Sequence, residues 1–117
     1  MNIPEHLSRA ISIRQPHVEL ILREEKLHEY RSWHTNIRER VFLYAAKTLT
    51  DAYGSVADNE LMDLPRGLIV GSVDIVACDW DSALQSFAFG VERPRRYDKP
   101  FKPLGQPQPG FWRPRFS

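Results

Sequence analysis

The chain has 117 residues, of which 42% are hydrophobic and 26% charged, and its formal net charge is +1. This length and composition predict that residues 1–117 form a single domain, and they exclude a polycationic protein. No run approaches the roughly 18 apolar residues of a membrane helix, and we expect no secretory signal. The single cysteine, Cys78, excludes a disulfide framework and a multi-cysteine zinc site. We therefore expect a reducing, cytoplasmic location and no contact with a membrane.

The end of the chain differs in composition from the rest. Residues 91–117 contain seven Lys or Arg against two Asp or Glu, and six of the nine prolines, whereas residues 1–90 have a net charge of −4. We interpret residues 92–117 as a Pro-rich basic arm packed on the domain, anchored by buried aromatic rings. The expected anchors are Phe111 and Trp112, and the residues expected to stay exposed are Arg95 and Arg96.

The first half of the chain predicts strands around one helix. Residues 10–13 alternate between apolar and polar side chains, as a half-buried strand does. Pro16 suits the first turn of a helix, because its missing N–H would have no partner there. An apolar helix face then continues to about Lys26. Residues 27–33 predict a short strand, and residues 41–46 are apolar on both faces, which is typical of a central strand.

A second helix is expected in the middle of the chain. Residues 51–61 have a helical pattern that Thr50 or Asp51 could cap, although Gly54 weakens it. Residues 64–67 contain Pro and Gly and predict a turn.

The strongest strand signal lies in residues 68–77, which are rich in Leu, Ile and Val. Gly71 inside this run indicates a bulge or a bend. Further strands are expected at residues 87–91 and 111–112. Several strands with two helices predict a small α+β domain with a curled sheet or barrel.

Functional groups are concentrated in residues 25–33. Side chains alternate along a strand, so Leu27, Glu29 and Arg31 are expected to share one face. A carboxylate that holds an arginine makes a fixed fork for a phosphate or a carbonyl group, and Lys26 could point to the same place. From the spacing alone, a surface ion pair contributing about 0–1 kcal/mol is the more common interpretation.

Other chemistries have little support in the sequence. The four histidines, at positions 6, 17, 28 and 34, lack the spacing of a metal site. No glycine-rich phosphate loop and no G-x-S-x-G motif occurs. Hydroxyl groups lie near the candidate site, but no motif marks one as a nucleophile. We therefore expect no metal and no cofactor.

Several blocks of sequence resemble a known family. Residues 10–16 read AISIRQP, residues 20–22 are apolar, and residues 26–33 read KLHEYRSW. Together they resemble the opening of ASCH domains, in the PUA-like superfamily, where R-Q-P ends a strand and G-x-K-x-x-E-x-R follows a helix. Blocks within residues 37–47, 64–76 and 105–112 resemble later family segments in the same order.

The resemblance implies a PUA-like β-barrel, a curled mixed sheet of about five or six strands with two or three short helices. It also implies a cleft beside the first helix that takes RNA or a modified nucleobase. The family glycine before the lysine is missing, because Arg23, Glu24 and Glu25 stand there, so the first helix must end in another way.

Some ASCH proteins are amidohydrolases on acetylated cytidine, and they use a lysine and a threonine three residues later, assisted by a glutamate. Lys26 matches the lysine, but Glu29 occupies the threonine position. A carboxylate cannot replace an activated hydroxyl in the same acyl-transfer step, so this activity is disfavoured.

The leading hypothesis is a module that binds RNA or a nucleotide in a cationic cleft. One alternative is a small hydrolase acting on a modified nucleoside or RNA, with Lys26 and Glu29 as its acid–base pair. Another is a protein-interaction module. The expected ligand-binding residues are Arg14, Gln15, Lys26, Glu29, Tyr30, Arg31, Trp33, Arg38 and Lys47.

Overall fold

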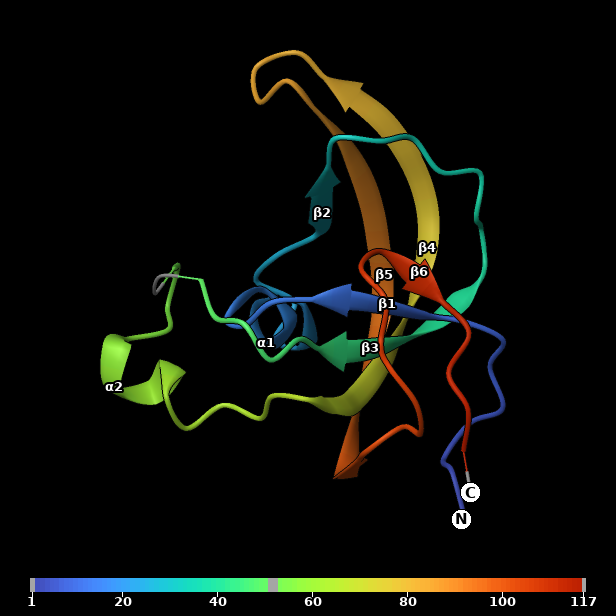
Figure 1. Cartoon of the computed structure of the whole chain (residues 1–117). Coiled ribbons are helices and arrows are strands. Elements are labelled where there is room, and N and C mark those ends of the chain that lie inside the picture. The colour runs from blue at the N-terminus through green and yellow to red at the C-terminus, as the bar shows by residue number, and fades with distance from the viewer. Residues whose placement is uncertain (1, 51–52, 117) are drawn as a thin grey trace.

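Six strands form one mixed sheet in the order β2-β5-β4-β3-β1-β6. The computed structural model describes residues 2–50 and 53–116. The elements are β1 (Ala10–Ile13), α1 (His17–Leu22), β2 (His28–Arg31), β3 (Arg40–Ala45), α2 (Asp58–Leu61), β4 (Leu68–Asp81), β5 (Ser86–Phe101) and β6 (Phe111–Trp112). β1 and β3 are parallel and the other neighbours antiparallel. The sheet is strongly curved (Figure 1), so the predicted α+β class with a curled mixed sheet is confirmed.

β3 lies in the middle of the core. Its side chains Val41 and Leu43 belong to the main cluster, which α1 joins through Val18 and Ile21. On the other face of the strand, its aromatic side chains belong to a second cluster, against which Ile3, Leu7, Phe101 and Phe116 pack. The predicted central strand is confirmed, and its two apolar faces are explained by segments near both ends of the chain.

Aromatic rings join the two edges of the curled sheet. β2 and β6 are the edge strands, yet Phe89 in β5 stacks on Phe111 in β6 with 6.1 Å between ring centroids. Trp33, just after β2, lies edge-on to both rings, at 5.2 and 5.9 Å. Side-chain packing therefore closes the curl at this seam of three rings.

The long hairpin of β4 and β5 extends beyond the rest of the fold (Figure 1). The bulge predicted at Gly71 is confirmed, since the pairing register of β4 and β5 shifts between Ile69 and Gly71. The strand predicted at residues 68–77 is longer, and the strand predicted at 87–91 continues to Phe101.

The expectation that the arm begins at residue 92 is therefore wrong for residues 92–101. This part of β5 pairs with β4, and Pro94 is accommodated because the register skips from Glu92 to Arg95. Arg95 and Arg96 are exposed, as expected, and Trp112 is buried at 8% exposure.

The first helix ends four residues before the predicted position, at Leu22. Glu24 adopts the left-handed conformation, with φ 61°, which a glycine would adopt at lower cost. The backbone N–H groups of Glu25 and Lys26 both donate to the Leu20 carbonyl, at 2.9 and 3.1 Å. The helix thus ends in a left-handed turn at a glutamate, near the position where the resemblance implies a glycine.

The second helix is much shorter than predicted. It covers Asp58–Leu61 and begins after Ala57, because Gly54 takes a left-handed φ of 62°. Asp51 lies outside the described residues, and Thr50 donates its hydroxyl to the Gln15 carbonyl, at 3.0 Å. Within the described residues, no helix is both long and apolar enough to cross a lipid bilayer.

Candidate functional site

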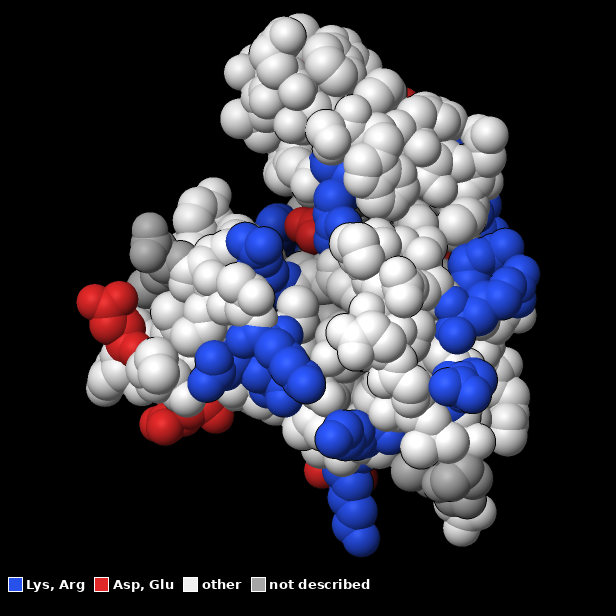
Figure 2. Space-filling model, viewed as in Figure 1, with Lys and Arg blue, Asp and Glu red and all other residues white. Residues whose placement is uncertain are grey.

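A cavity of about 710 Å³ opens beside α1, between β1, β2 and the loop at residues 106–110. Figure 2 shows it as a hollow below the hairpin, where Lys and Arg side chains surround a small acidic area. Its described lining includes Ser12, Arg14, His17, Lys26, Glu29, Tyr30, Arg31, Tyr44, Lys47, Thr48, Thr50, Tyr53 and Leu84.

A buried carboxylate holds two cations at this cavity. Glu29 is 6% exposed; its Oε1 lies 3.1 Å from Lys26 Nζ and its Oε2 lies 3.0 Å from Arg31 Nη2. Arg31 Nη2 also donates to the Ser12 carbonyl at 2.6 Å. The shared face predicted for Glu29 and Arg31 is thus observed, but the pair is buried, and the interpretation as a surface ion pair is wrong. Leu27 lies outside β2 and is exposed.

His17 completes this group from the first turn of α1. Its Nδ1 lies 2.9 Å from Lys26 Nζ, and its ring lies 5.2 Å from the ring of Tyr53. Burial lowers the pKa of His17, and the Lys26 ammonium lowers it further against the opposing effect of Glu29. An ammonium group can only donate, so Nδ1 accepts and the proton of the neutral ring is on Nε2.

Because His17 is neutral in the folded protein, we expect the free energy of unfolding to depend on pH. Folding lowers the pKa of His17 below its ordinary value of 6.5. The contribution of neutral His17 to the free energy of unfolding is therefore fully present above about pH 6.5 and is lost as the pH falls through the pKa of the folded state. We expect the free energy of unfolding to decrease between pH 7 and 5, as measured by urea titration. His17→Asn, which keeps an acceptor for Lys26 but does not titrate, should remove most of that decrease.

The matched control is His28→Asn, since His28 is exposed, and it should keep the wild-type pH dependence. The range stops at pH 5 because a separate loss is expected below the ordinary glutamate pKa of 4.5. Burial raises the pKa of Glu19, but ion pairs with Arg96 and Arg23 outweigh it and lower the pKa. Identical pH profiles for the wild type and His17→Asn would contradict the assignment.

The structure brings together six of the nine residues predicted to bind a ligand. Those that line the cavity are Arg14, Lys26, Glu29, Tyr30, Arg31 and Lys47. Gln15 is fully buried, Trp33 packs in the aromatic seam, and Arg38 donates to the Thr35 and Ile37 carbonyls. Gln15 and Arg38 thus hold neighbouring backbone in place, and Trp33 packs against other rings, so none of the three lines the cavity.

Sequence reasoning missed His17, Tyr53 and the loop at residues 106–110. The position of His17 directly after Arg-Gln-Pro, at the start of the helix beside the cleft, was an available signal. Tyr53 gave no signal, because the segment around it was predicted to be helical. The loop is placed by Ser12, whose N–H donates to the Gly110 carbonyl at 3.0 Å and whose hydroxyl donates to the Gln108 carbonyl at 2.7 Å.

The charges of the lining favour an anionic ligand. Its described residues include four Lys or Arg and one carboxylate, Glu29. Tyr30 and Tyr53, at 37% and 60% exposure, offer ring faces at the rim. Positive charge with exposed rings suits a phosphate joined to a base.

Two hydroxyl groups of the described lining, those of Ser12 and Thr50, donate to backbone carbonyls and not to a base. The Ser12 hydroxyl donates to Gln108 and accepts from Trp112 Nε1, at 2.9 Å, and Thr50 donates to Gln15. A nucleophilic hydroxyl instead needs a base as its acceptor. In the described parts of the chain, no group of three His, Cys, Asp or Glu could hold a metal ion.

The sequence matches the ASCH domain family over residues 11–107. This range includes Glu29 and the three residues grouped around it, His17, Lys26 and Arg31. A comparison with curated proteins finds no match. The match spans most of the chain and agrees with the curled α+β sheet and its cleft beside the first helix. This chain therefore belongs to the ASCH domain family.

Proposed function

We propose that the cavity binds single-stranded RNA or a nucleotide, and that it does so without catalysis. The observation that carries the proposal is the Glu29 carboxylate, which fixes Lys26 and Arg31 at a cavity whose other described charges are basic. Fixed cations recognise phosphate and base edges better than flexible ones, because less side-chain entropy is lost on binding. Residues 106–110 form one wall and leave the cavity open, which favours a ligand over closure by the chain's own arm.

The lining offers fixed donors for a phosphate or a base edge and rings for stacking on a base. Arg31 uses only Nη2 for its contacts with Glu29 and Ser12, so in the described structure its other guanidinium donors are left for a ligand. Tyr30 and Tyr53 offer stacking faces, and the neutral His17 offers the Nε2–H donor. Recognition of single-stranded RNA commonly combines such rings with fixed donors. The cytoplasmic location stays a prediction.

Lys26→Ala and Arg31→Ala are expected to weaken RNA binding about tenfold or more each, as the loss of a charged hydrogen bond does. Fluorescence titration against a short single-stranded RNA measures the affinity, and thermal melting establishes that each variant is folded. Lys99→Ala is the matched control, because Lys99 is exposed on β5 and lies outside the cavity lining. Equal affinities for folded wild type, Lys26→Ala and Arg31→Ala would remove the cavity from RNA binding.

The same proteins distinguish binding from hydrolysis. Both oxygens of the Glu29 carboxylate are engaged by cations, Oε1 by Lys26 and Oε2 by Arg31, so the carboxylate orients these side chains. We expect no acetate release from N4-acetylcytidine above background. Multiple turnovers that disappear in Lys26→Ala would instead establish the hydrolase alternative.

A further inference from the structure

We propose that the bound RNA leaves the cavity over a basic track made of Arg14, Lys47 and Arg66, and that the ligand is therefore a strand of several nucleotides. This inference rests on the proposed function and adds the direction of the strand and its minimum size. Arg66, outside the cavity lining, is the new residue in the proposal.

The three cations of the track lie on neighbouring segments, because β1 and β3 pair at Ile13 and Ala45, just before Arg14 and Lys47. Arg14 and Lys47 line the cavity, and Arg66 Nη1 donates to the Lys47 carbonyl at 3.3 Å. The Lys47 side chain lies over Gly67, where a Cβ atom would be 3.3 Å from Lys47 Cε. The track therefore continues from the cavity rim onto the turn before β4.

Buried Gln15 fixes the loops that carry the track. Its Nε2 donates to the Pro65 carbonyl at 3.1 Å, and its Oε1 accepts the Glu19 N–H at 3.0 Å. Its backbone carbonyl accepts the N–H and the hydroxyl of Thr50, at 3.1 and 3.0 Å. Gln15, predicted to bind the ligand, is instead a positioning residue for the loop after Lys47 and the turn of Arg66.

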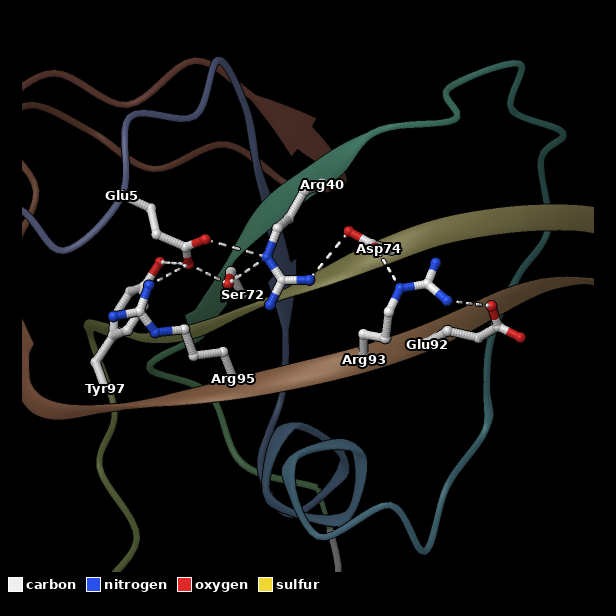
Figure 3. Close-up of polar contacts among 8 residues, drawn as sticks. All are labelled: Glu5, Arg40, Ser72, Asp74, Glu92, Arg93, Arg95 and Tyr97. Atoms are coloured by element: carbon white, nitrogen blue, oxygen red, sulfur yellow. Dashed lines mark hydrogen bonds and ion pairs between the residues drawn. The ribbon is translucent and has the colours of Figure 1, made fainter.

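The charges of the track are available to a ligand, whereas many other arginines are neutralised. In the described structure, Arg14, Lys47 and Arg66 have no carboxylate within ion-pair distance, and all three are exposed. Away from the cavity lining, Figure 3 shows the opposite arrangement, in which acidic and basic side chains alternate. There Asp74 lies between Arg40 and Arg93, at 3.0 and 2.6 Å. Such paired charges attract phosphate weakly.

The hairpin on the other side of the cavity is unsuited to phosphate. Residues 76–91 contain no Lys or Arg, but they contain Asp79 and Asp81. The exposed side chains there include Trp80 and Leu84, at 52% and 56% exposure, and Figure 2 shows this projection almost free of charge in that view. Lys and Arg side chains attract the phosphates of RNA. The RNA strand therefore leaves the cavity over the basic track and not along the hairpin.

Affinity as a function of length tests the track. The probes are cytidine monophosphate and oligocytidylates of two to six nucleotides, titrated at several salt concentrations. We expect affinity to rise over the first few nucleotides and then to level off. Arg66→Ser should weaken oligonucleotide binding about tenfold and reduce the salt slope by about 0.7, the value for one phosphate on a single strand. It should leave monophosphate binding unchanged.

Lys99→Ser removes the same charge outside the track and should leave the oligonucleotide affinity and salt slope near the wild-type values. Equal effects of Arg66→Ser and Lys99→Ser would overturn the track and leave only general electrostatics. An affinity that does not grow beyond the monophosphate would also overturn the track, while the proposed function would stand. No binding of any probe would overturn both.

Discussion

Replacing Gly71 with alanine is expected to lower the free energy of unfolding by about 3 kcal/mol or more, because the new atom has no room. A Cβ at this position would lie 2.2 Å from the backbone oxygen of Arg95 and 3.0 Å from Leu22 Cδ2. The carbonyl cannot move away without separating β4 from β5 at the bulge. Thermal melting should show a fall of roughly 10 °C or more.

Gly90→Ala is the matched control in the same hairpin. A Cβ at Gly90 would contact the Ala77 Cβ at 3.2 Å and Val76 Cγ2 at 3.4 Å, so mainly side chains must adjust. We expect a clearly smaller loss of stability for Gly90→Ala. Similar melting temperatures for the two variants would show that β5 can shift at the bulge, which the close contact of Gly71 with Arg95 argues against.

The second large effect is expected for Trp112→Ala. Trp112 packs edge-on to Tyr44 with 5.5 Å between ring centroids, and its Nε1 donates to the Ser12 hydroxyl at 2.9 Å. Removing it leaves a cavity in the second core cluster and takes a donor from Ser12, so we expect a loss of about 3–5 kcal/mol in a urea titration. RNA affinity should fall as well, because the Ser12 hydroxyl holds Gln108 in the cavity wall.

Trp80→Ala provides a control with the same change in side-chain volume. Trp80 is half exposed and contacts Phe87 near the tip of the hairpin, so its loss should cost less than about 1 kcal/mol. If Trp80→Ala destabilised the protein as much as Trp112→Ala, the anchoring role of the last strand would be wrong.

Local patterns were sufficient for the strands of the core. The strands at residues 10–13 and 111–112 have the predicted bounds, and β3 differs from its predicted range by one residue at each end. Their signals are runs of hydrophobic side chains that can be recognised in the local sequence, although the segments that bury them are distant in sequence. The bulge at Gly71 was also predictable, since a glycine inside an apolar strand commonly marks a bulge or a close approach of another backbone.

Other features depend on contacts that are distant in sequence. Residues 92–101 looked like a basic arm, but Arg93 pairs with Asp74 and Arg95 with Glu5, partners that no local window contains. At the site, the spacing of Glu29 and Arg31 predicted that the two side chains would pair. The burial of Glu29 could not be predicted from the spacing, because segments distant in sequence cover it. His17 joined the group only because the chain turns back after α1 and brings Lys26 to it.

At the seam of Trp33, Phe89 and Phe111, side-chain packing and not backbone hydrogen bonding joins the edges of the sheet. The width of the cavity opening beside it can therefore change without a change in strand pairing. Gly110, beside the seam, is part of the cavity lining, and a Cβ there would lie 3.1 Å from Trp33 Cζ2. We therefore expect the size of the Trp33 ring to affect the position of Gly110 and, through it, the width of the opening. We expect aromatic substitutions at the seam to change the size of the opening while the strands keep their pairing.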